Sequence, residues 1–185
     1  MRTEAQLRQV FHETFDALPQ DVRSQIETLW LRYGVQHDDE EDGHFNLKIS
    51  KETTILDSEI QLRPRQIWEA PLYPTSEIFR FAEKAAEMIK SSRGRCGQTN
   101  GVVFWFKASV VDNAPGEMLK IVIAHELAHA YSAAQVGVIF PDAAHRLGRT
   151  LVEEETNARS LARQWGFDDI PLYAWIEGNA AKLFQ

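Results

Sequence analysis

The sequence predicts an α+β fold in a single domain, with a small twisted β-sheet packed on two helices and further helices at both ends of the chain. Three observations support this prediction. Short runs with alternating apolar side chains lie in the first half of the chain, residues 119–134 form an apolar run without glycine or proline, and the 185 residues are 44% hydrophobic and 25% charged. This composition is ordinary for one globular domain with a full core. In order, the chain divides into an N-terminal helical segment (1–36), a sheet-and-helix region (45–112), a region of two helices (114–167) and a C-terminal helix (168–185).

Residues 3–33 are expected to form two amphipathic helices that separate at Pro19. The apolar side chains that share one stripe are Leu7, Val10, Phe11, Phe15 and Leu18 in the first helix and Val22, Ile26, Leu29 and Trp30 in the second. We interpret both helices as packing elements, with a partner-binding hairpin as the functional alternative. The acidic stretch 37–44 lacks the alternating ligand spacing of a cation site and is interpreted as a solvated loop.

The sheet is expected from the segments that follow. Residues 47–49 and 60–62 alternate between apolar and polar side chains, and nearby prolines interrupt the pattern. A helix capped by Thr75 or Ser76 comes next. Residues 101–107 are rich in β-branched and aromatic side chains and predict another strand shortly before the long apolar run.

The pentapeptide His125-Glu126-Leu127-Ala128-His129 is the most informative feature of the chain. Residues four apart on a helix lie one turn above each other on the same face, so both histidines can bind one metal ion. Glu126 is displaced around the helix and can reach a water molecule on that metal. Most neighbouring residues are apolar or small, so this polar trio would be buried without a partner unless a metal supplied one. The motif predicts metal-assisted hydrolysis, and two ordinary buried histidines are the alternative.

A third metal ligand is expected from the acidic residues downstream, because catalytic sites usually have three protein ligands. Glu153, Glu154 and Glu155 begin a second helical stretch that stops at Gly166, which is a suitable C-cap. One of these glutamates would face the histidines. Asn157 lies one turn after Glu153 and is expected to hold His125 or a ligand carboxylate by hydrogen bonding.

The two motifs together resemble the gluzincin-type HExxH zinc metallopeptidases, whose third ligand is a glutamate on a second helix. In thermolysin-like enzymes and in the ImmA/IrrE family that glutamate lies four residues before an aspartate or asparagine. The resemblance therefore implies His125, His129 and Glu153 as the metal ligands. Glu154 and Glu155 remain alternatives, because a boundary shift of one residue rotates a helix by about 100°.

The resemblance covers residues 100–167 and also implies the arrangement of the fold. It implies a zincin-like α+β domain in which the sheet packs on the active-site helix and on the second ligand-bearing helix. It further implies that the strand at 101–107 is an edge strand beside the cleft, where it pairs with an extended peptide substrate. A buried core strand without substrate contact is the alternative.

The expected reaction is peptide hydrolysis by a metal-activated water, with Glu126 as the general base that later protonates the leaving amine. Such sites usually add a hydrogen-bond donor for the developing oxyanion. His145 is our first choice for this donor, and a solvent-facing or capping histidine is the alternative. The other candidate donors are Arg146, Arg149, Tyr131 and Tyr173.

Zn²⁺ is the expected cofactor, because two histidines and a glutamate with one open position are its usual catalytic ligand set. Manganese, iron and cobalt would bind similar ligands. Cys96 is the single cysteine, so an internal disulfide is excluded. A metal-ligand role for Cys96, as in peptide deformylases, is a weaker alternative, because the signature of that family is missing and a structural thiol explains the residue.

The remaining composition bounds the partners and the location. The formal net charge is −7, which argues against a broad nucleic-acid-binding face. The sequence contains no stretch of eighteen uninterrupted apolar residues, so it predicts no membrane-spanning helix. We expect a cytoplasmic protein that acts on a protein or peptide substrate. A metal-stabilised protein-binding module without turnover, or a hydrolase of a non-peptide amide, would use the same residues, and the oligomeric state is not specified by the sequence.

Overall fold

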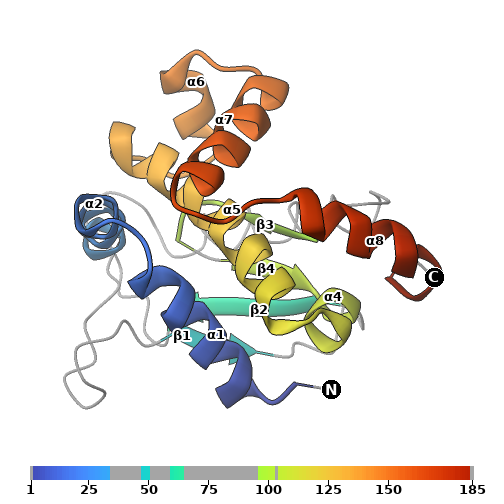
Figure 1. The fold of residues 1–185 in the computed structure, drawn as a ribbon. Coiled ribbons are helices and arrows are strands. Elements are labelled where there is room, and N and C mark those ends of the chain that lie inside the picture. The colour runs from blue at the N-terminus through green and yellow to red at the C-terminus, as the bar shows by residue number, and fades with distance from the viewer. Residues whose placement is uncertain (1, 34–46, 51–58, 65–95, 103, 184–185) are drawn as a thin grey trace.

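The computed structural model describes residues 2–33, 47–50, 59–64, 96–102 and 104–183. Its elements, in chain order, are α1 (Glu4–Asp16), α2 (Gln20–Arg32), β1 (Leu47–Ser50), β2 (Glu59–Pro64), β3 (Gly97–Thr99), β4 (Phe104–Lys107), α4 (Ala108–Asn113), α5 (Gly116–Val136), α6 (Asp142–Leu147), α7 (Leu151–Gln164) and α8 (Ile170–Leu183) (Figure 1). The predicted helix after Thr75 and the acidic stretch 37–44 lie outside the described residues.

The long helix α5 is the centre of the fold. It follows Pro115 and ends at Gly137, whose φ of 68° lies in the left-handed region that glycine adopts without steric cost. The helix is apolar on almost every side, and α1, α2, α7 and β3 all pack against it (Figure 1). The sequence-based prediction of a long buried helix around the HELAH motif is confirmed.

The helices α1 and α2 are packing elements, as predicted. Thr3 and Gln6 form a capping box at the start of α1, and the apolar stripes of both helices lie in the hydrophobic core. Trp30 stacks on Phe15 with ring centroids 5.2 Å apart, and Phe11 packs edge-to-face on Phe104 of β4 at 5.1 Å. Aromatic contacts of this geometry join the two N-terminal helices to the sheet.

The sheet contains four antiparallel strands in the order β1-β2-β4-β3 among the described residues. The strands expected at 47–49 and 60–62 are β1 and β2. The strand expected at 101–107 is β4, which begins at Phe104 and lies between β2 and β3. The edge strand on the α5 side is therefore β3, and the prediction of an edge strand at 101–107 is wrong.

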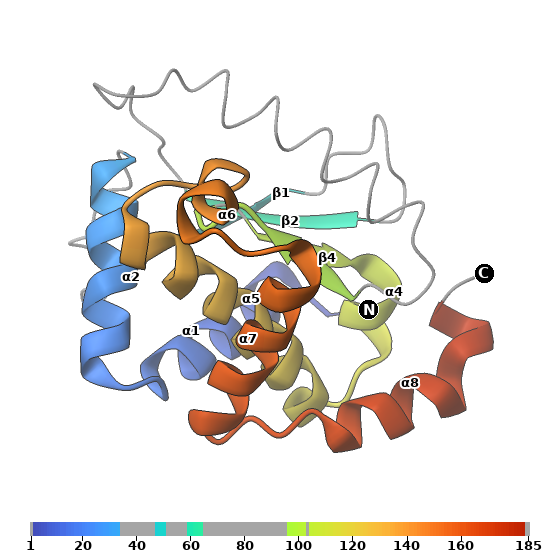
Figure 2. The same ribbon diagram turned by 90° about the horizontal axis from the view of Figure 1, so that it is seen from above.

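The predicted α+β class, with a sheet that carries both ligand-bearing helices, needs correction. The described part of the chain is predominantly helical, and the strands in it are only three to six residues long. β3 packs on α5, whereas α7 packs on α5 from another side instead of on the sheet (Figure 2). The reason is that α5 is apolar nearly all round, so it buries surface against helices as much as against strands.

The turn between β3 and β4 sits tightly on α5. Gly101 has a φ of 105°, and a side chain there would place its Cβ 3.0 Å from the Cβ of Ala133 on α5. The carbonyl of Gly101 accepts a hydrogen bond from the indole Nε1 of Trp30 at 2.9 Å. The backbone can approach α5 this closely only because a glycine stands at the turn.

The C-terminal helices complete the domain. α7 lies along α5, and α8 then runs past the end of α5 toward α4, where Ser109 Oγ donates a hydrogen bond to the carbonyl of Leu183 at 2.9 Å (Figure 2). The aromatic residues Trp165, Phe167 and Trp175 near the C-terminus are partly buried against the core. Within the described ranges, every helix is too short or too polar to cross a bilayer.

Candidate metal centre

Helix α5 presents His125 and His129 on one face, one turn apart, as the four-residue spacing predicts. The two rings meet edge-to-face with centroids 4.9 Å apart, and their Nε2 atoms are separated by 3.2 Å. Phe140, from the segment after α5, packs edge-to-face on His129 at 6.1 Å. Both imidazoles therefore direct a nitrogen to the same point beside the helix.

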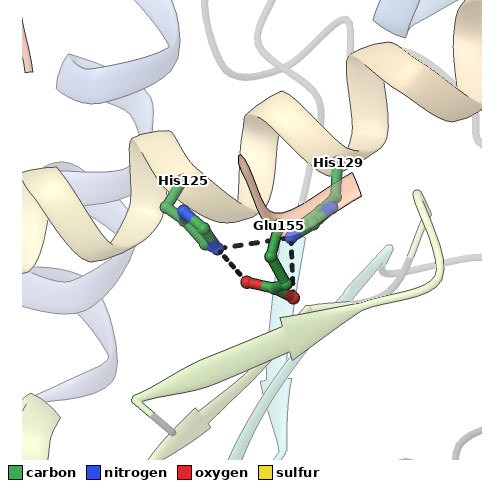
Figure 3. A group of neighbouring side chains, drawn as sticks. All are labelled: His125, His129 and Glu155. Carbon is green, nitrogen blue, oxygen red and sulfur yellow. Dashed lines mark hydrogen bonds and ion pairs between the residues drawn. The ribbon is translucent and has the colours of Figure 1, made fainter. Parts of the chain in front are cut away.

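Glu155 of α7 brings a carboxylate to that point (Figure 3). Its Oε2 lies 3.2 Å from His125 Nε2, and its Oε1 lies 3.4 Å from His129 Nε2. Ligand atoms of these three residues all lie within 4.8 Å of one another. The group could hold a metal ion, and it is the only such cluster of histidine, cysteine and acidic side chains among the described residues.

The spacing of the three ligand atoms provides a test of that fit. Around a tetrahedral ion with bonds of about 2.0–2.1 Å, neighbouring ligand atoms lie about 3.3 Å apart. The Nε2 atoms of His125 and His129 are 3.2 Å apart, and they lie 3.2 and 3.4 Å from different oxygens of the Glu155 carboxylate. Two imidazole nitrogens and a carboxylate this close together could serve as ligands of one small divalent cation, and all three residues line the cavity described below.

The electrostatics of the group also favour a positive charge. Burial lowers the pKa of His129, but its contacts with Glu154 and Glu155 and the nearby charge of Glu126 outweigh burial and raise the pKa to about 10. Hydrogen bonds from His125 and His129 hold the pKa of Glu155 well below its usual range despite partial burial. The carboxylates around His129 therefore favour a positive charge at this place.

Glu154 orients the ring of His129. Its Oε1 lies 3.3 Å from His129 Nδ1, and its Oε2 accepts a hydrogen bond from Arg149 Nη1 at 2.9 Å. Burial raises the pKa of Glu154, but contacts with His129, Ser132 and Arg149 lower it overall, so the carboxylate is charged. When Nδ1 donates to Glu154, the Nε2 lone pair of His129 points at the metal position, which is the usual role of a carboxylate behind a metal-binding histidine.

Two predicted roles on α7 are wrong. Glu153 was expected to be the third ligand, but its carboxylate accepts hydrogen bonds from the backbone N–H and the hydroxyl of Thr150 at 2.7 and 2.9 Å. Thr150 and Glu153 form the capping box of α7, so Glu153 belongs to the helix start, and Glu155 is the glutamate that contacts both histidines. Asn157 was expected to hold His125 or a ligand carboxylate, but its Nδ2 donates to Ser132 Oγ at 3.2 Å.

A cavity of about 420 Å³ opens beside the group, and most of its described lining is apolar. Its apolar side chains come from α5, α7 and α8 and include Ile121, Val122, Leu151, Leu172 and Ile176. Gly97 and Thr99 of β3 form part of its wall. The candidate metal position therefore lies at one end of an apolar pocket, the arrangement in which ligand sites are usually found.

Glu126 lines the same cavity and is only 4% exposed. Its place next to His125 turns it around the helix from the histidine face, as expected from the motif. Cys96 also lines the cavity, and burial together with the charge of Glu126 raises the pKa of its thiol to about 11. Within the described residues, Cys96 does not belong to the metal-binding group, so a ligand role for it is not supported.

His145 is misplaced for the predicted oxyanion role. It lies in the last turn of α6 with an exposed side chain, and the neighbouring Ala144, not His145, lines the cavity. The structure brings Tyr173 of α8 to the cavity instead, together with Arg159 of α7, which the sequence analysis did not single out. Arg159 lies four residues after Glu155, so helical spacing was the available signal.

Comparisons with protein-family models, with curated proteins and with solved structures find no match for this chain.

Proposed function

We propose that this chain is a zinc-dependent peptidase, with His125, His129 and Glu155 as the metal ligands. The observation that carries the proposal is that ligand atoms of the three residues lie within 4.8 Å of one another, next to a buried Glu126 in the same cavity. A bound zinc would supply a water of lowered pKa and a Lewis acid for the scissile carbonyl. Two histidines and one carboxylate with an open position favour zinc over the harder cations.

Glu126 is the general base in this proposal. Its carboxylate takes a proton from the attacking water and returns it to the leaving amine, which is the role that the residue after the first histidine of HExxH performs chemically. Because Glu126 is buried beside an apolar cavity, its carboxylate is shielded from bulk water. A binding module without turnover would have no chemical use for a buried carboxylate at this position.

Tyr173 replaces His145 as the proposed donor to the developing oxyanion. Among the donors that the sequence offers for this task, Tyr173 is the one in the described cavity wall. Burial raises the pKa of its hydroxyl, and the charge of Arg159 lowers it by less, so the phenol keeps its proton at neutral pH. A neutral phenol can donate a hydrogen bond to an oxyanion.

The edge strand β3 is the proposed docking strand for an extended substrate. Gly97 and Thr99 line the cavity, and the outer edge of β3 has no strand partner among the described residues. A peptide chain could add to this edge by backbone hydrogen bonds and pass the metal position. The substrate is then a peptide or an unfolded protein segment.

The test compares wild type with Glu126→Gln, which preserves side-chain size and removes the base. Metal content is measured by plasma mass spectrometry, and cleavage of a random-sequence peptide mixture is followed by mass spectrometry. We expect about one zinc per chain in both proteins and a rate roughly 10²- to 10⁴-fold lower in the variant. A zinc-loaded wild type that cleaves none of the mixture would refute the peptidase proposal and favour a metal-stabilised binding module.

A further inference from the structure

Arg159 is the one arginine or lysine among the described residues that line the cavity, and it does not belong to the candidate metal group. It lies on α7 one helical turn beyond Glu155, which is roughly 6 Å along the helix axis. Its side chain is 41% exposed, and its location in the cavity wall makes it accessible to a ligand there.

Two contacts fix the guanidinium in place. Arg159 Nε donates to Asp169 Oδ2 at 2.7 Å, and its Cζ lies 4.9 Å from the ring centroid of Tyr173. Asp169 is 7% exposed, and its other oxygen accepts a hydrogen bond from Arg163 Nε at 2.7 Å. A guanidinium held through Nε and an aromatic face keeps its two terminal nitrogens directed elsewhere, with little rotamer freedom left to lose on binding.

Those terminal nitrogens have no acceptor within the described residues, where Asp169 is the partner of Arg159. Asp169 is shared with Arg163, which also lies 3.9 Å from the exposed Asp168. The carboxylate of Asp169 is therefore shared between two arginines, and Arg159 is the arginine of the two that lines the cavity. The paired N–H donors of a guanidinium match a carboxylate in geometry and in the sign of their charge.

We propose that Arg159 recognises a carboxylate of the substrate and so sets the specificity of the proposed peptidase, on which this inference rests. Arg159 lies one helical turn from Glu155 in the wall of the same cavity, so we expect this carboxylate to lie close to the scissile bond. The apolar wall takes the side chain that precedes it. The carboxylate is either the C-terminus of a peptide or an acidic side chain.

Binding of three peptides distinguishes these sources. The probes are an acetylated apolar tripeptide with a free C-terminal carboxylate, the same peptide as its C-terminal amide, and an amide of equal length that contains one glutamate. Calorimetry uses the zinc-loaded full chain carrying Glu126→Gln, so that no probe is cleaved. We expect at least one carboxylate probe to bind roughly 10- to 100-fold more tightly than the neutral amide.

The matched variants are Arg159→Gln and Arg163→Gln, both in the Glu126→Gln background. Arg159→Gln should abolish the preference for the carboxylate and leave binding of the neutral amide unchanged, which also shows that the cavity is intact. Arg163→Gln should keep the preference, because Arg163 holds the same Asp169 but does not line the cavity. Tight binding of the free acid alone assigns the C-terminus, and tight binding of the glutamate peptide assigns an acidic side chain.

Several outcomes would overturn the proposal. The first is equal affinity for the acid and amide probes. The second is an equal loss of affinity for both probes in Arg159→Gln. The third is loss of the preference for the acid in Arg163→Gln, which would indicate a structural role through Asp169. These results are separate from the peptidase proposal, because binding needs no turnover. A retained acid preference in a protein whose wild type cleaves nothing would refute hydrolysis alone.

Discussion

Replacement of Glu155 by alanine tests the assignment of the third ligand most directly, with Glu153→Ala as the matched control on the same helix. In Glu155→Ala, His125 and His129 keep their 3.2 Å separation, but both contacts of 3.2 and 3.4 Å to the carboxylate are lost. Loss of a residue behind a metal ligand typically weakens metal binding roughly 10- to 100-fold, and loss of a ligand itself should exceed that range. Glu155→Ala should therefore weaken zinc binding by more than about 100-fold.

The control should behave in the opposite way. Glu153 accepts hydrogen bonds only from Thr150 among the described residues, so Glu153→Ala removes half of a capping box and should lower the folding stability slightly. The melting temperature should therefore fall only slightly. Its affinity for zinc should not change.

The assay is competition for zinc against a chromophoric chelator, with metal content and thermal melting measured on the same samples. Loss of zinc from Glu153→Ala with retention in Glu155→Ala would refute the packing of α7 on α5 described above. Equal loss in both variants would show that the helix start, and not the ligand, controls the site.

Three further predictions concern the surroundings of the site. Glu154→Gln should weaken zinc binding roughly 10- to 100-fold by the same competition assay, because the charged partner of His129 Nδ1 is lost; an unchanged affinity would contradict the orienting role. Burial raises the pKa of Asp169, but hydrogen bonds from Arg163 and Arg159 lower it more, so the folded-state pKa lies below the ordinary 3.8. The stability that charged Asp169 contributes is therefore present above pH 3.8 and is lost as the pH falls through the lower folded-state pKa. Circular dichroism melts between about pH 5 and pH 2 should therefore show a steeper loss of stability in wild type than in Asp169→Asn, and parallel curves would contradict the prediction. Gly101→Ala should destabilise the protein by about 1–3 kcal/mol in chemical denaturation, because it strains a φ of 105° and brings a Cβ to 3.0 Å from that of Ala133; a loss below about 0.5 kcal/mol would show that the turn relaxes.

Local signals in the sequence explain the predictions that are confirmed. The buried α5 follows from its unbroken apolar composition, and the α1 and α2 stripes follow from helical periodicity. The short strands β1 and β2 follow from alternation. The predominance of helices over strands does not follow from local signals, because the sequence pattern does not show which sides of an apolar helix will be covered by helices and which by strands.

A local pattern in the sequence places Glu153 at the start of α7 and not at the site. Thr150 followed three residues later by Glu153 is a capping-box pattern, and it assigns that carboxylate to the helix start. The buried face of α7 gives a second signal, since Glu154, Ala158 and Ala162 lie four residues apart and are all buried. The glutamate at the edge of this face is Glu155.

The sequence by itself determined that His125 and His129 share a face and that Glu126 lies beside them, because one helical turn fixes these relations without help from the rest of the chain. Only the tertiary structure decided that Glu155 completes the group, that His145 stays outside and that Arg159 and Tyr173 join the cavity. The physical reason is that these residues lie on separate helices, and the rotation of α7 and the placement of α8 against α5 depend on how their buried faces pack, which no local pattern specifies.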